Sequence, residues 1–346
     1  MKTKNKRKSN LKSLLLLLLL TAVILISSTY AWFTANPTVT VQSMNVNIQA
    51  QNGLEISADA VNWKSIIQTA DLLNSTTLDA NYATWKNQIP TSQLPVSTGG
   101  SVADVDTGTG YLGMYWGEVD TTGTYKLTAT QETDGKGTSG KYIAFDLFFR
   151  VNKPTDVLIT TDSSVNAVGT DKGIQNATRI AFIDHGSTPS SSTSAAMQAL
   201  KAKRAVHLWE PNYDVHSPTG VANALWNYGQ TTTETGATAL VYKGIIDDIA
   251  LGDGVLLAQD PTDATEYDDY LRTVVPTIQT KKSFSSDGIN EDLFQLDKGV
   301  TKIRIYMWIE GQDVDCENSA SGTDIEYKLQ ITTGTVYMDD GVTPEP

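Results

Sequence analysis

KYIAFDLFFRVN, residues 141–152, is the stretch that decides the fold class of this chain. Apolar residues recur at every second position, as expected of a β-strand. One face carries Ile143, Phe145, Leu147, Phe149 and Val151, and the other carries Tyr142, Ala144, Asp146, Phe148 and Arg150. Both faces are largely apolar, so the pattern predicts a central strand that is buried on both sides.

Similar alternation recurs along the chain, whereas helical patterns are short. The expected strands are Thr38–Ala50, Val157–Thr161, Thr178–Asp184, Ala205–Asn212, Thr301–Gly311 and Asp324–Thr333. Helical patterns occur only at Ser191–Arg204 and around Ala239–Ala250. The sequence therefore predicts an all-β fold, a jelly-roll-like β-sandwich with long loop insertions and one or two short helices.

The domain organisation follows from these patterns. We expect a signal peptide or membrane anchor at residues 1–31, a single β-sandwich domain at 32–337 and an acidic tail at 338–346. The segments 58–140 and 213–300 have little periodicity and are expected to be insertions in this domain. The shared core is predicted to contain Phe145, Leu147, Phe149, Ile305, Met307 and Leu329.

The first 36 residues have the features of an export signal. Six basic residues precede the apolar run Leu14–Ile26, and Thr29 and Ala31 stand at positions −3 and −1 of a cleavage site. Cleavage there would start the mature chain at Trp32. The alternative is an uncleaved anchor, because residues 13–33 are long enough to span a bilayer. Either reading places the rest of the chain outside the cell, secreted or on the cell surface.

Charge and cysteine content narrow the possible partners. Residues 1–31 carry six positive charges and no negative ones, so the net charge of −13 becomes −19 after cleavage. Such acidity disfavours nucleic acid and anionic lipid as partners. Cys316 is the only cysteine, which excludes an internal disulfide. A secreted chain of this kind must be stabilised by its β core, by bound cations or by assembly.

The expected strand Thr38–Ala50 is the candidate assembly strand. Its apolar residues are Val39 and Val41 on one face and, after a one-residue shift at Ser43–Met44, Met44, Val46 and Ile48. It contains no charged residue, although exposed edge strands usually carry charge. The strand either pairs within its own sheet or completes a sheet of a neighbouring copy. Asn52–Gly53 predicts a hairpin turn, with the chain returning along residues 54–58.

The junction Thr29–Phe33, TYAWF, lies at the end of the apolar run and precedes a Thr/Val strand. It resembles the junction in Gram-positive proteins of the TasA/camelysin group, which are exported through a SipW-type signal peptidase. The segments His207–Asn212 and Met307–Cys316 are similar to those of Firmicute exported proteins with this signal type.

This resemblance implies a jelly-roll subunit of the extracellular matrix whose N-terminal strand can pair with the next subunit. The implied partners are further copies of the chain, the export signal peptidase and other matrix components. Camelysin was named for proteolysis, so the resemblance also implies metalloprotease activity. This chain is longer than typical members of the group, and its middle insertions depart from their pattern.

The catalytic motifs sought in the sequence are absent. The three histidines, His185, His207 and His216, form neither an HExxH motif nor an i, i+4 pair. There is also no G-x-S-x-G nucleophile elbow. Cys316 stands between Asp315 and Glu317, a negative setting that opposes thiolate formation. We therefore expect no catalytic residues and no enzyme activity.

Acidic loops and aromatic residues supply the remaining candidates. Glu310, Asp313, Asp315 and Glu317 follow a strong strand and form a candidate calcium site, the alternative being a solvated acidic face. A second acidic group consists of Asp260, Asp263, Glu266, Asp268 and Asp269. A carbohydrate platform could be formed by Trp63, Trp85, Tyr115, Trp116 and Trp226, which more often pack in the core.

Two functions follow from these observations. The first is an exported structural subunit of an extracellular matrix or surface filament, assembling as a homo-oligomer through the N-terminal strand. The second is a cell-surface adhesin or glycan-binding module that uses the aromatic residues of its loops.

Overall fold

The computed structural model describes most of the chain from Val41 onward. The described residues are 41–42, 44–50, 54–75, 87–119, 126–216, 231–234, 237–240, 242–250, 255–256, 269–282, 284, 288–316 and 322–345. The predicted export signal, its cleavage site at Thr29, Ala31 and Trp32, and Val39 lie outside these ranges. No helix within them is long and apolar enough to span a membrane.

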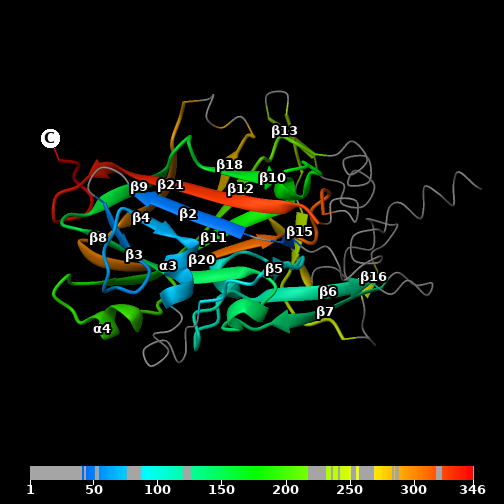
Figure 1. Cartoon of the computed structure of the whole chain (residues 1–346), viewed down its shortest axis with the longest axis horizontal. Helices are drawn as coiled ribbons and strands as arrows, with labels where there is room; N and C mark the ends of the chain where they lie inside the picture. Colours follow the sequence, from blue (N-terminus) through cyan, green and yellow to red (C-terminus); the bar gives the residue numbers. More distant parts are fainter. Residues whose placement is uncertain are drawn as a thin grey trace, which may run out of the picture.

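Two six-stranded sheets form the body of the molecule (Figure 1). The first has the order β19 (Glu291–Leu296), β9 (Thr155–Ile159), β21 (Asp324–Val336), β2 (Met44–Ala50) and β4 (Ile66–Gln68), with β10 (Ser164–Val168) also paired to β21. The second has the order β18 (Ile278–Thr280), β12 (Val206–Pro211), β11 (Thr178–Thr188), β20 (Gly299–Ile309), β8 (Ile143–Val151) and β3 (Glu55–Ser57).

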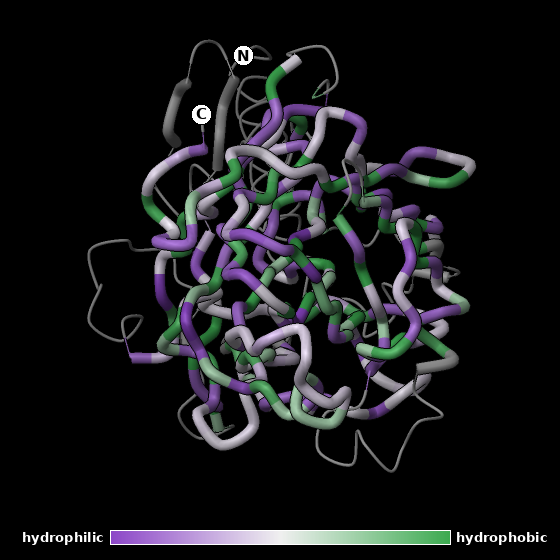
Figure 2. Tube along the Cα trace, turned by 90° about the vertical axis from the view of Figure 1, so that its left-hand side faces the viewer, coloured by the Kyte–Doolittle hydropathy of each residue, from purple (hydrophilic) through white to green (hydrophobic). Residues whose placement is uncertain are grey.

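The hydrophobic core lies between these two sheets. Alternate residues of β8 and β20 pack against those of β2, β9 and β21 in one buried cluster. This cluster contains all six residues of the predicted core: Phe145, Leu147, Phe149, Ile305, Met307 and Leu329. Figure 2 shows hydrophobic and hydrophilic residues interspersed along the chain. The prediction of an all-β sandwich is therefore confirmed.

The outer face of the second sheet is buried as well. Tyr142, Ala144, Tyr306 and Trp308 pack in a second cluster with residues from the insertions, among them Leu112 and Met114. In β8 the residues from Ile143 to Phe149 are all buried, which confirms the two-sided burial predicted for this strand. Every side chain of its neighbour β20 is buried as well.

Short strands from both insertions build this outer layer and the molecule's periphery. They are β6 (Met114–Val119) with β7 (Lys126–Glu132) and β16 (Val255–Leu256), β15 (Tyr242–Ile245) with β17 (Leu271–Val274), and β13 (Thr231–Glu234) with β14 (Ala237–Leu240). A further insertion strand, β5 (Ser92–Gln93), pairs with β1 (Val41–Gln42) of the N-terminal segment. The insertions also contribute β4, β18 and β19 to the edges of the main sheets.

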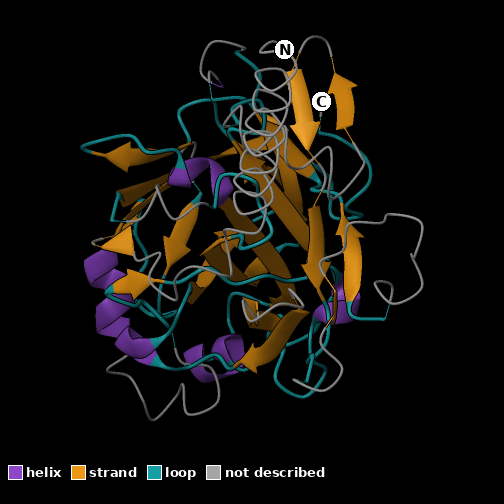
Figure 3. Ribbon diagram, turned by 90° about the vertical axis from the view of Figure 1, so that its right-hand side faces the viewer, coloured by secondary structure: helices purple, strands orange, loops and turns teal. Residues whose placement is uncertain are grey.

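Helices are few and short among the described residues (Figure 3). They are α3 (Thr69–Ser75), α4 (Ser194–Gln198) and the 3₁₀ turns η1 (Val102–Asp104), η2 (Gly137–Ser139) and η3 (Ile174–Ala177). The helix expected within Ser191–Arg204 is confirmed as α4, which Thr193 caps by accepting a hydrogen bond from the Ala196 amide.

The prediction of a helix around Ala239–Ala250 is wrong. The chain there forms β14 and β15, and β15 pairs with β17 while burying Tyr242 and Ile245. Helix propensity is a weak preference, and the tertiary pairing of two strands overrides it.

The N-terminal strands confirm one prediction and correct another. The expected shift at Ser43–Met44 coincides with the boundary between β1, which pairs with β5, and β2, which joins the first sheet. The hairpin expected at Asn52–Gly53 does not form, because β3 pairs with β8 in the opposite sheet. The chain crosses between the layers, and β4 takes the position beside β2.

Candidate metal centre

The loop that follows β20 holds its acidic residues in a tight series of turns. The Glu310 amide donates to Ala177 O over 2.7 Å, which ties the loop to the residue before β11. The Asp313 amide then donates to Glu310 O and the Cys316 amide to Asp313 O, each over 3.1 Å. The Cys316 side chain is fully buried in the main core. These contacts fix both ends of the loop.

The segment that follows β12 approaches this loop from the other side. Asn212 has a left-handed backbone with φ of 58°, which turns the chain at the end of the strand. Its side-chain amide donates to Val165 O over 3.0 Å, and its carbonyl accepts from the Val215 amide over 3.0 Å. The turn places His216 next to the loop after β20.

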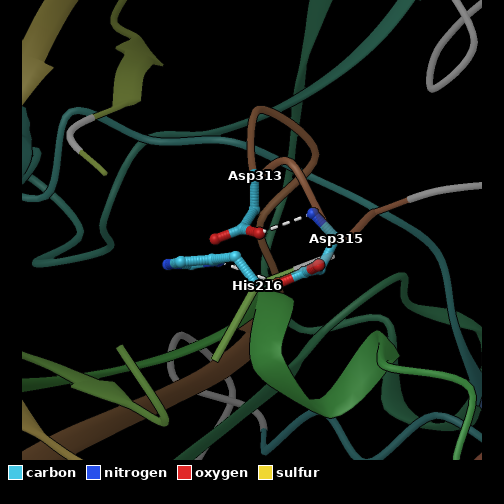
Figure 4. A group of neighbouring side chains, drawn as sticks. All are labelled: His216, Asp313 and Asp315. Atoms are coloured by element: carbon cyan, nitrogen blue, oxygen red, sulfur yellow. Dashed lines mark hydrogen bonds and ion pairs between the residues drawn. The ribbon is translucent and has the colours of Figure 1, made fainter. Parts of the chain in front are cut away.

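His216, Asp313 and Asp315 meet where these two segments come together (Figure 4). His216 Nδ1 lies 2.9 Å from Asp315 Oδ2, and the Asp315 amide donates to Asp313 Oδ1 over 2.8 Å. One potential ligand atom from each residue lies within 4.8 Å of the others. All three side chains are about 3 % exposed, so the cluster is shielded from water.

Arg179 on β11 is the cation of this region. Its guanidinium bridges two carboxylates, with Nη2 at 2.6 Å from Asp313 Oδ2 and 2.6 Å from Glu210 Oε1. The register of β11 and β12 pairs Ile180 with Trp209, which places Arg179 opposite Glu210. Both side chains of this pair are almost fully buried.

Glu310 is the fourth buried carboxyl group. Its oxygens accept hydrogen bonds from Trp308 Nε1 and from the Gln312 amide, each over 3.0 Å. Burial raises the pKa of Glu310 to about 7, because hydrogen bonds compensate the desolvation only in part. Burial likewise raises the pKa of Glu210, although Arg179 opposes this shift.

The imidazole of His216 responds to the same surroundings. Burial lowers its pKa, but the hydrogen bond with Asp315 and the charges of Asp313, Asp315 and Glu210 outweigh burial and raise the pKa. We call this set the acidic network: Arg179, Glu210, His216, Glu310, Asp313 and Asp315. It holds four carboxyl groups against one guanidinium and one imidazole.

A second buried ionic network lies further along the same face of β20. Arg304 Nη2 lies 2.7 Å from Asp134 Oδ2 and Arg304 Nη1 lies 2.8 Å from Asp146 Oδ1, while Lys302 Nζ lies 3.1 Å from Asp146 Oδ2. The Tyr306 hydroxyl donates to Asp134 over 2.6 Å. We call Asp134, Asp146, Lys302 and Arg304 the balanced network, because two carboxylates face two cations.

The structure brings together only part of the predicted calcium set. Asp313 and Asp315 meet in the cluster, whereas the oxygens of Glu310 accept hydrogen bonds from Trp308 and Gln312. Glu317 lies outside the described residues, as do Asp260, Asp263, Glu266 and Asp268 of the second acidic group. Asp269 is described and exposed.

Sequence reasoning missed His216, Arg179 and Glu210 as members of this region. His216 and Asp315 lie 99 residues apart in the chain, and Arg179 lies on β11, before both of them. Only the pairing of β12 and β20 with β11 brings them together. No local spacing motif could have indicated this arrangement.

Comparisons with known proteins give this chain no relatives. No family model, no curated protein and no solved structure matches it.

Proposed function

We propose that this chain is an exported structural subunit of an extracellular matrix or surface filament that assembles as a homo-oligomer. The export part of the proposal rests on the basic and apolar N-terminus and on its resemblance to the TasA/camelysin junction. The chain has one cysteine, which is buried in the core, so its sandwich is built without internal disulfides. Such a β core suits an extracytoplasmic structural protein.

The observation that carries the assembly proposal is the position of β2. This uncharged strand is inserted between β21 and β4, with Met44 to Ala50 paired in parallel with Ile325 to Ile331. Val46 and Ile48 are buried in the main core. In the structure the strand therefore pairs within its own chain.

The same position can be filled by the strand of a neighbouring copy. A parallel neighbour needs no tight turn to β21, and the pairing uses backbone groups that any copy of β2 presents equally. Exchange of an identical element between copies is an economical route to a filament. Because β2 follows the predicted cleavage site closely, we expect strand exchange only after the export signal has been removed.

Electron microscopy of the purified secreted chain is the primary test. Fibres support a structural subunit, whereas a monodisperse particle at all concentrations contradicts it. N-terminal sequencing of the same material should read Trp-Phe-Thr-Ala-Asn. Recovery of the intact N-terminus in the membrane fraction would instead support the anchor.

Cysteine cross-linking separates strand exchange from self-pairing. Asn47 and Lys328 are exposed and face each other in the β2–β21 register, and neighbouring strands bring Cα atoms within disulfide range. In a Cys316→Ala background, an equimolar mixture of the single variants Asn47→Cys and Lys328→Cys should give covalent dimers in fibres if β2 is donated. Asn47→Cys mixed with Asp292→Cys on β19, a distant edge strand, is the matched control.

The double variant Asn47→Cys/Lys328→Cys reports pairing within one chain. If the mixture of single variants forms fibres without covalent dimers, and the double variant cross-links within one chain, strand donation is ruled out and the fibres must assemble through another surface.

The adhesin or glycan-binding alternative gains no support from the described aromatic residues. Arg150 Cζ lies 4.2 Å from the ring centroid of Trp63, and Lys141 Nζ lies 5.0 Å from the ring centroid of Trp116. Tyr115 is buried and its hydroxyl donates to Ile246 O. Trp85 and Trp226 lie outside the described residues. The described rings thus interact with their own chain.

A further inference from the structure

We propose that His216, Asp313 and Asp315 bind one divalent first-row transition metal ion of the zinc class. This site shares Asp313 and Asp315 with the calcium site expected from the sequence, but it has His216 as its third ligand and takes a different metal. It joins two segments that are distant in the sequence, the turn after β12 and the loop after β20 (Figure 4).

The ligand geometry supports a small ion. Zinc binds nitrogen and oxygen ligands at about 2.0–2.1 Å, which in a tetrahedral site places ligand atoms roughly 3.3 Å apart. The observed separations range from 2.9 Å, between His216 Nδ1 and Asp315 Oδ2, to at most 4.8 Å across the cluster. Side-chain adjustments of about an ångström therefore suffice to bring all three ligands to one ion.

The histidine ring can make this adjustment at low cost. The only hydrogen bond that the structure gives its Nδ1 is the one with Asp315. Nε2 of the same ring is buried and has no hydrogen-bond partner among the described residues. Buried imidazoles normally have both nitrogens satisfied. An ion at Nε2 would satisfy this nitrogen and break no contact of the ring, whereas an ion at Nδ1 would replace the one contact with Asp315.

The charge of the region points in the same direction. Four carboxyl groups, those of Glu210, Glu310, Asp313 and Asp315, are at most 4 % exposed. Buried carboxylates are costly unless a cation compensates them. Arg179 contacts the carboxylates of Glu210 and Asp313, and the imidazole of His216 contacts that of Asp315. The adjoining sequences 217–230 and 317–321 contain no lysine or arginine. A divalent cation at the cluster would add to the compensation that Arg179 and His216 provide.

The imidazole selects the class of metal. Calcium takes six to eight oxygen ligands and rarely nitrogen, whereas imidazole suits zinc and its neighbours in the first transition row. Arg179 holds the Asp313 carboxylate from behind, as outer partners of ligating carboxylates do in known metal sites. Three protein ligands leave a fourth coordination position for water or for a further group.

Metal titration of the purified chain, dialysed against a chelator, tests this proposal. Zinc should bind with a stoichiometry of one in isothermal titration calorimetry, and calcium more weakly. Cobalt should give the visible absorption of a site with a nitrogen ligand. His216→Gln should lower zinc affinity at least about 100-fold and abolish the cobalt spectrum, and Asp315→Asn should lower zinc affinity at least about tenfold.

The matched control is His207→Gln. His207 lies on the neighbouring strand β12, is half-buried and packs against the ring of Phe294, outside the cluster. It should bind zinc as the unaltered chain does. Near-ultraviolet circular dichroism must show the native fold for every variant, and Asp315→Asn provides a second ligand variant if His216→Gln fails to fold.

Three outcomes would overturn the proposal. The folded chain could fail to bind zinc, manganese or cobalt at 100 μM, a concentration on the order of 10⁻⁴ M at which a site of biological use should be filled. The His216→Gln variant could bind zinc as tightly as the unaltered chain. Calcium could bind more tightly than zinc and be insensitive to His216→Gln, which would establish an oxygen-only site.

Discussion

The two ionic networks on the outer face of β20 differ in how their charges are compensated. In the balanced network Asp134 and Asp146 face Lys302 and Arg304, with each side chain fully buried. In the acidic network four buried carboxyl groups surround Arg179 and His216.

The same strand and the same degree of burial thus give two different electrostatic results. In the balanced network the number of carboxylates equals the number of cations. In the acidic network the carboxyl groups outnumber the cations, so the excess negative charge can be neutralised by protons or by a metal cation. The difference suggests that the balanced network serves the fold and the acidic network serves binding.

The largest effect should come from removing the central cation of the balanced network. Arg304→Met leaves Asp134 and Asp146 buried with Lys302 as their only cation in this network, and breaking a buried pair in this way costs about 3–5 kcal/mol. The loss should appear in the free energy of unfolding measured with urea.

The control is Arg204→Met, which removes an exposed pair with Asp297 and should cost at most about 1 kcal/mol. Equal losses in the two variants would show that burial of the Arg304 pairs has no special weight.

Binding of a divalent metal ion should compensate the negative charge of the acidic network and stabilise the folded state. At a zinc concentration 100 times its Kd, binding to the folded state alone raises the free energy of unfolding by about 2.7 kcal/mol. Thermal unfolding with zinc and with a chelator measures this increment. It should persist in a folded Arg304→Met variant and disappear in His216→Gln. An increment that persists in His216→Gln would place the ion elsewhere.

His185 on β11, which interacts with the charges of the balanced network, should give the chain an acid-sensitive stability. Burial is the main cause that lowers the pKa of His185 to about 3, and Lys302 and Arg304 add to it while Asp146 opposes it. The unfolded state takes up a proton near pH 6.5, so stability is lost as the pH falls from 6.5 toward 3.

Between pH 7 and pH 5 this loss should amount to roughly 2 kcal/mol. His185→Gln removes the titrating group and should flatten the dependence of the urea midpoint on pH over this range. Parallel curves for the variant and the unaltered chain would show that His185 does not cause the acid sensitivity.

The smallest effect is expected for a surplus carboxyl group of the acidic network. Because the pKa of Glu310 is raised to about 7, its carboxyl is substantially protonated at neutral pH. Glu310→Gln keeps the shape and an oxygen that can accept from Trp308, so stability at pH 7 should change by no more than about 1 kcal/mol. A loss comparable to that of Arg304→Met would mean that both networks depend on fixed charge.

The sequence predicted the sandwich because its main strands carry their signal locally. The two-residue period of Ile143–Val151 and of Ile303–Ile309 identified both the strands and their core faces. The hairpin at Asn52–Gly53 failed because a turn motif does not determine which sheet the next strand joins. The helix near Ala239 failed because a weak local preference yielded to pairing with β17.

The candidate site was predictable only in part, for a related reason. Asp313 and Asp315 share one loop, so their spacing was visible in the sequence. His216 and Arg179 reach that loop through the pairing of β11 with β12 and β20. These pairings are set by the burial of whole strands, and no pattern of single residues encodes them.

The parallel pairing of β2 with β21 has a consequence for the order of folding. It joins the first long strand of the described residues to the last, with residues 51–323 between them. Closing so large a loop is entropically costly, and contacts between distant segments form slowly. The first sheet therefore cannot be completed until the C-terminal strand has been synthesised, and a chain that emerges N-terminus first stays incompletely folded until its synthesis is almost finished.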